Sequence, residues 1–287
     1  MLYGAKALAV PLKFGQKMIV RENSRPGVIE WETIVMNKSW FRASFRLQDM
    51  AVLESSDQKT ASFIHHLLEK GGELQPEHFR NSEGLSIQCH LDFDIRWGMG
   101  SSSSLVSNLA QWLDIDPYAY YRSTFQGSGY DVYCARANGP MTFRLNHDRC
   151  EIHEVHFRPA FADHLFFIYS GRKQDSQESV KKFISKPFKD EKIINNISNL
   201  TEAFINSPDL EDFLSVIRSH EAIISEALGL PAVKQEFFPD FKGEIKSLGA
   251  WGGDFMMAAT SMNDKEVKEY FHQKNLDVVF GWDEIIY

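Results

Sequence analysis

LSIQCHLDFDIRWGMGSSSSLVSNLAQWL, residues 85–113, is the stretch that decides the fold. Its first part, residues 85–95, alternates strictly between apolar and polar side chains, which predicts a half-buried strand. After the four serines the apolar spacing becomes that of a helix, because one helical face collects Leu105, Val106, Leu109, Ala110, Trp112 and Leu113. The stretch therefore predicts a strand, a glycine-rich loop and a helix in succession.

The loop between this strand and this helix has the composition of a phosphate-binding turn. Glycines let backbone amides approach an anion closely, serine hydroxyls add donors or a magnesium ligand, and a helix start presents unpaired N–H groups. An isolated Gly-x-Gly is more often an ordinary turn with a serine cap, but its place between a strand and a helix favours an anion site. The spacing fits neither a Walker loop nor a dinucleotide fingerprint. The residues predicted to bind the phosphates are Gly98, Met99, Gly100, Ser101, Ser102, Ser103 and Ser104.

Three motifs, in this order along the chain, resemble those of the GHMP kinases. Gly98-Met99-Gly100-Ser101-Ser102-Ser103 resembles the signature Gly-Leu-Gly-Ser-Ser-Ala, and Gly127-Ser128-Gly129-Tyr130-Asp131-Val132 is similar to the Ser-Gly-x-Asp segment. Residues 246–254, KSLGAWGGD, resemble the late Gly-Ala-Gly-x-Gly-Gly motif, with Trp251 in place of a glycine. The residues of the last two motifs resemble those of the GYDIA family, a bacterial branch that is grouped with mevalonate kinases.

The resemblance implies a role for each motif. ATP binds at residues 98–104 with Mg2+ on Ser102, and Asp131 is the catalytic residue that accepts the proton of the attacking hydroxyl or orients it. The alternative for Asp131 is a carboxylate that bonds a turn amide, and the alternative for the late motif is a tight loop between a helix and a strand. The residues expected at the substrate are Gly129, Tyr130, Lys173, Gly249, Ala250, Trp251, Gly252 and Gly253.

The chain departs from the family pattern at two places. Its opening residues, 3–11, resemble only the second half of the N-terminal pattern, without the preceding strand whose lysine pairs with the catalytic aspartate in relatives. Either the start codon is misassigned or the protein lacks that lysine. Where mevalonate kinases have a magnesium-binding Glu, this chain has residues 118–121, YAYY, which contain no acid, and the nearest acid is Asp116.

The predicted fold class is α+β, because strands and helices mix without strict alternation. The resemblance implies a two-domain GHMP kinase architecture, with an S5-like N-terminal domain at residues 1–158, its first strand missing, and a ferredoxin-like C-terminal domain at residues 159–287. Further strands are expected within residues 7–20 (two), 31–36, 40–47, 141–145, 164–169, 255–260 and 278–282. Helices are expected at residues 60–69, 176–185, 190–206, 210–228 and 266–274, with Ser207 as the cap of the fourth.

Composition limits the partners and the location. The 287 residues carry a formal charge of -8, which argues against a broad nucleic-acid surface. Three cysteines without paired spacing are expected to be buried thiols. No segment approaches the roughly 20 apolar residues that span a bilayer, and the opening residues lack signal-peptide character, so we expect a cytoplasmic protein. The expected partner is a small-molecule substrate, with a homodimer left open, and neither nucleic acid nor membrane is expected.

The resemblance implies an ATP-dependent kinase for a small metabolite. Mevalonate is the first acceptor to test and phosphomevalonate the second, and a sugar or homoserine stays open. The rival class is a non-catalytic nucleotide-binding regulatory protein, favoured by the absent lysine and the absent acid. Outside the motifs, His220 and Glu221 fall on a predicted helix, where a core-edge structural role is more common than ligand binding.

Overall fold

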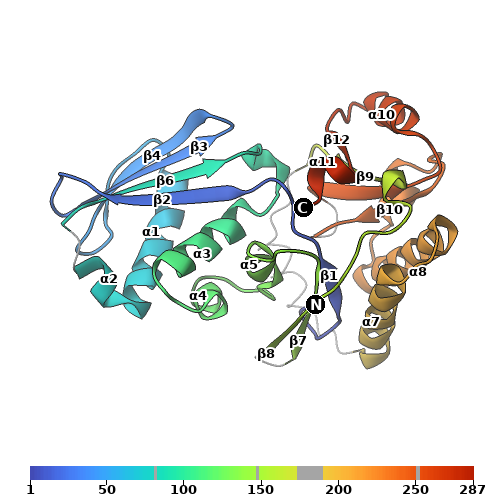
Figure 1. The fold of residues 1–287 in the computed structure, drawn as a ribbon, viewed down its shortest axis with the longest axis horizontal. Helices are drawn as coiled ribbons and strands as arrows, with labels where there is room; N and C mark the ends of the chain where they lie inside the picture. Colours follow the sequence, from blue (N-terminus) through green and yellow to red (C-terminus); the bar gives the residue numbers. More distant parts are fainter. Residues whose placement is uncertain (81–82, 147–148, 173–189, 250–252) are drawn as a thin grey trace. The chain divides into compact units, whose positions relative to one another are not determined.

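The chain forms two compact units (Figure 1). The computed structural model describes residues 1–80, 83–146, 149–172, 190–249 and 253–287. We name the units by their order along the chain. The inner unit is Phe14–Arg136, and the outer unit consists of the two flanking segments, Met1–Lys13 and Ala137–Tyr287. The units divide at other residues than the predicted domains, because a strand near the N-terminus pairs with residues 141–143 and so groups with the later part of the chain. The domain boundary at residues 158 and 159 stays a prediction.

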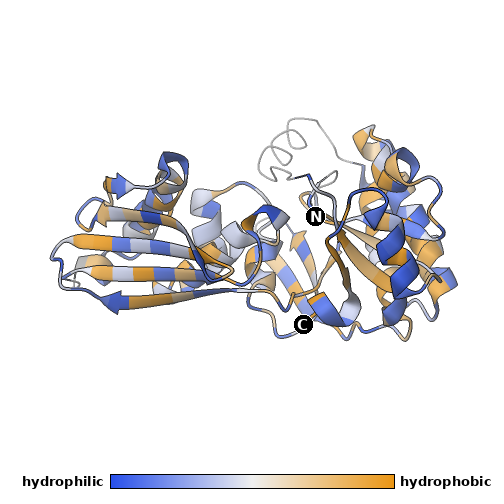
Figure 2. Ribbon diagram, turned by 90° about the horizontal axis from the view of Figure 1, so that it is seen from above, coloured by the Kyte–Doolittle hydropathy of each residue, from blue (hydrophilic) through white to orange (hydrophobic). Residues whose placement is uncertain are grey.

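The inner unit is built on a five-stranded sheet in the order β2-β6-β3-β4-β5. Buried and half-buried residues alternate along β6, as the sequence predicted, and bands of opposite hydropathy cross the neighbouring strands (Figure 2). β3 and β4 form a hairpin whose turn, Met36 and Asn37, has positive φ angles of 47° and 64°, as a two-residue turn of the primed type requires. The strands are β2 (Gln16–Glu22), β3 (Val28–Val35), β4 (Lys38–Arg46), β5 (Val52–Ser55) and β6 (Leu85–Leu91).

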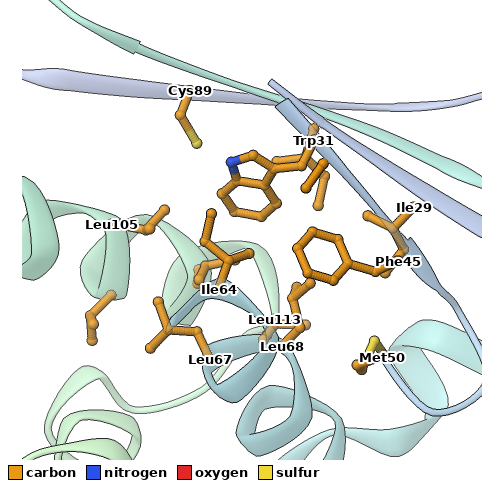
Figure 3. Close-up of a cluster of buried hydrophobic side chains, with 14 of the residues drawn as sticks. Ile29, Trp31, Phe45, Met50, Ile64, Leu67, Leu68, Cys89, Leu105 and Leu113 are labelled. Carbon is orange, nitrogen blue, oxygen red and sulfur yellow. The ribbon is translucent and has the colours of Figure 1, made fainter. Parts of the chain in front are cut away.

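Helices cover one face of this sheet and enclose the core between helix and strand (Figure 3). Trp31 from β3 lies among Ile64, Leu67 and Leu105, and its indole N–H donates to the Thr33 hydroxyl at 3.1 Å, so the buried ring keeps a polar partner. The helical elements are α1 (Gln58–Leu74), α2 (Pro76–Arg80), η1 (Ile95–Trp97), α3 (Ser101–Trp112), α4 (Pro117–Thr124) and α5 (Tyr130–Cys134).

The outer unit contains two antiparallel sheets. Three strands pair in the order β1-β7-β8 and four in the order β10-β11-β9-β12, the latter packed with a second core that includes Phe166, Phe241 and Phe271. The strands are β1 (Ala7–Ala9), β7 (Met141–Asn146), β8 (Arg149–Glu154), β9 (Leu165–Tyr169), β10 (Glu244–Ser247), β11 (Phe255–Ala259) and β12 (Val279–Gly281). The helical elements are η2 (Ala162–His164), α7 (Glu191–Ile205), α8 (Leu210–Leu228), α9 (Val233–Phe237), α10 (Asp264–His272) and α11 (Trp282–Ile285).

The α+β class is confirmed, and two local predictions are wrong. β6 ends at Leu91 instead of residue 95, because the Asp94 carboxylate accepts the Arg96 amide and starts the short helix η1. The cap of α8 is Asp209, which accepts the Asp212 amide, whereas the Ser207 hydroxyl donates to the carbonyl of Ala203.

The structure tests the predictions for the cysteines and for a membrane-spanning helix. Cys89 is buried as predicted, whereas Cys134 and Cys150 are half-buried, and none of the three forms a disulfide within the described residues. The helix predicted at residues 176–185 lies outside the described residues. Within the described part of the chain, no helix combines the length and the apolar character needed to cross a bilayer.

Candidate active site

The loop from η1 to α3 has the backbone of an anion-binding turn. Gly98 and Gly100 both adopt left-handed φ angles, of 68° and 82°, which side chains other than glycine rarely tolerate. Gly100 is the N-cap of α3 and supplies no side-chain cap, and a Cβ built on it would meet no atom within 4 Å. The first hydrogen bond of the helix runs from the Ser104 amide to the Gly100 carbonyl. The amides of residues 101–103 therefore take no part in the hydrogen bonds of the helix. This helix start suits phosphate oxygens.

The adjacent serines of α3 point in different directions, because each residue turns about 100° around a helix axis. Ser102 is exposed. The Ser103 hydroxyl donates to Oδ2 of Asp131. The Ser104 hydroxyl donates to Oε1 of Gln16 at 2.7 Å and contacts the Gly100 carbonyl at 2.9 Å, so Ser104 ties the helix to β2 and to its own cap. Of these four serines, Ser102 is exposed and the other three are half-buried.

Asp131 is half-buried in the first turn of α5, a short helix that begins at Gly129. Its Oδ1 accepts the Val132 amide at 3.1 Å and its Oδ2 accepts the Ser103 hydroxyl. Burial raises the pKa of Asp131, and the hydrogen bond from Ser103 opposes that rise. Burial also raises the pKa of the neighbouring Tyr130, and it raises the pKa of Cys134 to about 11. These two neighbours therefore stay neutral at pH 7.

Tyrosines of α4 form the wall behind the Asp131 loop. Gly129 has a φ of 72°, and a Cβ there would lie 3.0 Å from the Tyr118 ring and 3.1 Å from the Tyr121 ring. The Tyr121 hydroxyl donates to the Gln126 carbonyl at 3.1 Å, and the rings of Tyr118 and Tyr133 stack with centroids 6.2 Å apart. The glycine is therefore required both by its backbone angle and by the rings. The second motif is a compact, aromatic-backed support for Asp131.

The structure brings the first two motifs together within the inner unit. The Ser103 hydroxyl joins α3 to Asp131, and Gly129 and Tyr130 lie next to Asp131 along the chain. Asp116, the nearest acid before the motif, accepts the Ala119 amide at 2.8 Å and caps α4. Asp131 bonds a turn amide as well, which was the alternative for it, but that bond occupies one oxygen only.

Ser102 is the residue of the first motif that suits magnesium. Magnesium is held in nucleotide sites by one or two protein oxygens together with phosphate oxygens and water. Ser102 is an exposed residue in the first turn of α3. The described residues contain no group of three or more His, Cys, Asp or Glu side chains placed to hold a metal ion.

The third motif connects two antiparallel strands of the outer unit, β10 and β11, so the alternative of a tight loop between a helix and a strand is wrong. Gly249 has a φ of 60° and Asp254 one of 44°, and the Asp254 amide donates to the Arg172 carbonyl at 2.8 Å. Gly253 is buried. The predicted substrate residues Lys173, Ala250, Trp251 and Gly252 lie outside the described residues.

His220 and Glu221, for which the sequence favoured a structural role at the edge of the core, belong to a buried polar cluster at the end of β10. Glu221 of α8 is 4% exposed; its Oε1 lies 3.2 Å from Nζ of Lys246, and its Oε2 accepts the Ser247 amide at 3.2 Å. Nδ1 of His220 lies 3.0 Å from the same Lys246 nitrogen. Burial lowers the pKa of both Lys246 and His220. The signal in the sequence was a His-Glu pair beside the apolar stripe of a helix.

Comparisons with known proteins agree with the motifs at the level of the fold. No family model and no curated protein matches the chain. Among solved structures, the chain is similar to the Lin0012 protein from Listeria innocua, with 11% identity, a TM-score of 0.69 and coverage of 96% of this chain and 90% of that one.

Two kinases have similar structures as well. The mevalonate kinase of Methanococcus jannaschii matches with 15% identity, a TM-score of 0.64 and coverage of 97% of this chain and 91% of that one. The phosphomevalonate kinase of Streptococcus pneumoniae, solved with phosphomevalonate and AMPPNP, matches with 13% identity, a TM-score of 0.65 and coverage of 97% and 98%. The chain therefore has the fold of the GHMP kinases, as its three motifs predicted.

Proposed function

We propose that the protein is an ATP-dependent kinase that transfers the γ-phosphoryl group to a small metabolite. One observation carries the proposal: the Ser103 hydroxyl joins the open start of α3 to the carboxylate of Asp131. A phosphate-binding helix terminus and a candidate proton acceptor, 28 residues apart in the chain, thus lie one hydrogen bond apart. This is the pairing that phosphoryl transfer to a hydroxyl needs.

The residues of the inner unit divide the work as follows. The amides at the start of α3 bind phosphate oxygens, and Asp131 orients the acceptor hydroxyl and receives its proton as the new P–O bond forms. Mg2+, held by Ser102 together with the nucleotide, would neutralise phosphate charge. In the outer unit, Gly249 and Gly253, with the rest of the third motif and Lys173, are the proposed contacts to the substrate.

Mevalonate is the proposed acceptor, with phosphomevalonate as the alternative and a sugar or homoserine after it. A mevalonate kinase and a phosphomevalonate kinase have this fold. The residues of the last two motifs also resemble a branch that is grouped with mevalonate kinases. The non-catalytic alternative is a protein that binds the nucleotide in the same way and regulates through that binding. We also propose a cytoplasmic location and leave the homodimer as a prediction.

A panel of acceptors tests the proposal. The full chain is incubated with Mg-ATP and either mevalonate, phosphomevalonate, homoserine, galactose or a hexose phosphate, and ADP and the phosphorylated product are measured together. We expect one acceptor to give product, and we expect Asp131→Asn to lower kcat by roughly 100-fold or more while ATP binding by calorimetry is retained. ATP binding without product from any acceptor would favour the regulatory alternative. Unchanged turnover in Asp131→Asn would remove Asp131 from the chemistry.

A further inference from the structure

The hydroxyl of Ser103 has no counterpart in the glycine-serine signature that the first motif resembles. The signature that residues 98–103 resemble ends in alanine, whereas this chain has a serine at that place. The serine is half-buried, and its hydroxyl points from α3 to the carboxylate of α5. A hydroxyl has a single proton to donate. While Ser103 donates that proton to Asp131, its side chain cannot also donate to a phosphate.

The two oxygens of Asp131 are held by two different helices. Oδ1 accepts an amide of its own helix, from Val132, and Oδ2 accepts the hydroxyl of α3. The terminal torsion of an aspartate has a broad minimum, so a carboxylate held at one oxygen can still rotate. Held at both oxygens, its plane is fixed. Each oxygen keeps a second lone pair, so the carboxylate can still accept a bond from a substrate hydroxyl.

We infer that Ser103 is a positioning residue for Asp131, which fixes the plane of the carboxylate relative to the phosphate-binding turn of α3. This inference rests on the proposed kinase function. Because Ser103 belongs to the first turn of α3, the bond ties the proton acceptor to the same turn that binds the phosphates. Accurate placement of reacting groups is the main source of rate in phosphoryl transfer, so this bond supports kcat more than nucleotide affinity.

The charged form of Asp131 also benefits from this hydroxyl. Burial raises the pKa of the carboxyl, and the bond from Ser103 lowers it again. Tyr130 and Cys134 interact with Asp131, and because their pKa values are both raised, they remain protonated neighbours. Ser103 is thus a side-chain donor that favours the ionised form of the proton acceptor.

Three single variants on α3 test the inference with the full chain, Mg-ATP and the acceptor that the wild type phosphorylates. Ser103→Ala removes the hydroxyl and restores the residue of the signature. Ser103→Thr keeps a hydroxyl at the same place. Ser107→Ala is the matched control one turn later, because the buried Ser107 hydroxyl has no hydrogen-bond partner among the residues that the structure describes. For each variant, kcat, KM for ATP and the unfolding temperature are measured.

We expect Ser103→Ala to lower kcat by about 10- to 100-fold, the effect of losing one hydrogen bond to a charged group. KM for ATP and the unfolding temperature should change little, Ser103→Thr should recover most of kcat, and Ser107→Ala should match the wild type. An unchanged kcat in Ser103→Ala overturns the inference, as does a rise in KM for ATP without a fall in kcat. A wild type that phosphorylates no acceptor contradicts the proposed function first, and the inference with it.

Discussion

The Glu221 carboxylate binds the side chain of Lys246 and the backbone of Ser247 at once, with Oε1 to Nζ and Oε2 to the amide both 3.2 Å apart. It therefore links the end of β10 to α8 at the first two residues of the third motif. Both side chains of the ion pair are largely buried, with 5% and 17% of their surfaces exposed. A buried pair of this kind matters most when one partner is removed, because the other charge then has no counterion.

Glu221→Ala should lower the free energy of unfolding by about 3 kcal/mol, since it strands a buried ammonium group and a backbone amide. Urea unfolding measures the change. The double variant Glu221→Leu with Lys246→Met should recover much of the loss, because it removes both charges. Glu226→Ala, at an exposed carboxylate on the same helix, is the control and should stay within about 0.5 kcal/mol of the wild type. A loss in the control equal to that in Glu221→Ala would contradict the role of the pair.

The His220 ring makes the stability of the outer unit depend on pH. Burial is the main cause that lowers the pKa of His220 from the ordinary value of 6.5. The positive charges of Lys246 and of the Met1 α-amino group lower this pKa further, whereas the Glu221 carboxylate raises it. The unfolded chain then binds a proton that the folded chain does not, so stability is complete above the ordinary pKa and falls as pH drops below it.

Urea-unfolding midpoints between pH 8 and pH 5 should show this dependence. The wild type should lose stability below about pH 6.5, and His220→Gln, which cannot take the proton, should show a shallower decline. His272→Gln is the control, since that ring is 77% exposed and lies on α10, away from the cluster in sequence. Identical declines in the wild type and in His220→Gln would assign the pH dependence to other groups.

Gly129 of the second motif should tolerate substitution poorly. Its left-handed φ and the Tyr118 and Tyr121 rings leave an alanine Cβ no relaxed place, so Gly129→Ala should cost about 1–3 kcal/mol in stability. Because α5 begins there, kcat should fall as well. The control is Gly15→Ala in the same unit, where a Cβ meets nothing within 4 Å and φ is not in the left-handed range, so stability should change little. Thermal unfolding and turnover at one temperature check both variants.

The sequence predicted the elements with long, regular patterns and missed the short ones. α8 occupies the predicted residues 210–228, because nineteen residues at helical spacing leave little ambiguity. β10, with four residues and no alternation around Lys246, gave no strand signal and becomes visible only through its pairing with β11. The alternation of β6 continued past Leu91 in the sequence, but pairing with β3 stops at Leu91, and a local carboxylate bond at Asp94 takes over.

The sequence predicted which residue types form the candidate site, but it did not predict which way each side chain points. The motifs identified the serines and Asp131, whose placement next to one another the structure supports. Which serine faces the aspartate could not follow from four identical letters, because it depends on the rotation of α3 against α5 and β2. Ser104 is directed to Gln16 by the same rotation that directs Ser103 to Asp131. The pattern of neighbours, not the motif, decides the role of each hydroxyl.

The pH dependence of turnover should report the ionisation of Asp131. Its pKa is raised by burial above the ordinary 3.8, so kcat should fall at acidic pH as the carboxylate takes up a proton and can no longer accept that of the substrate. Tyr130 and Cys134, with raised pKa values, stay protonated throughout that range and leave the acidic limb to Asp131. In Ser103→Ala the hydrogen bond that lowers this pKa is gone, so the acidic limb should move to higher pH. Ser107→Ala should leave the limb where the wild type has it, and a limb at the same pH in all three proteins would mean that another group, such as the nucleotide, controls the rate.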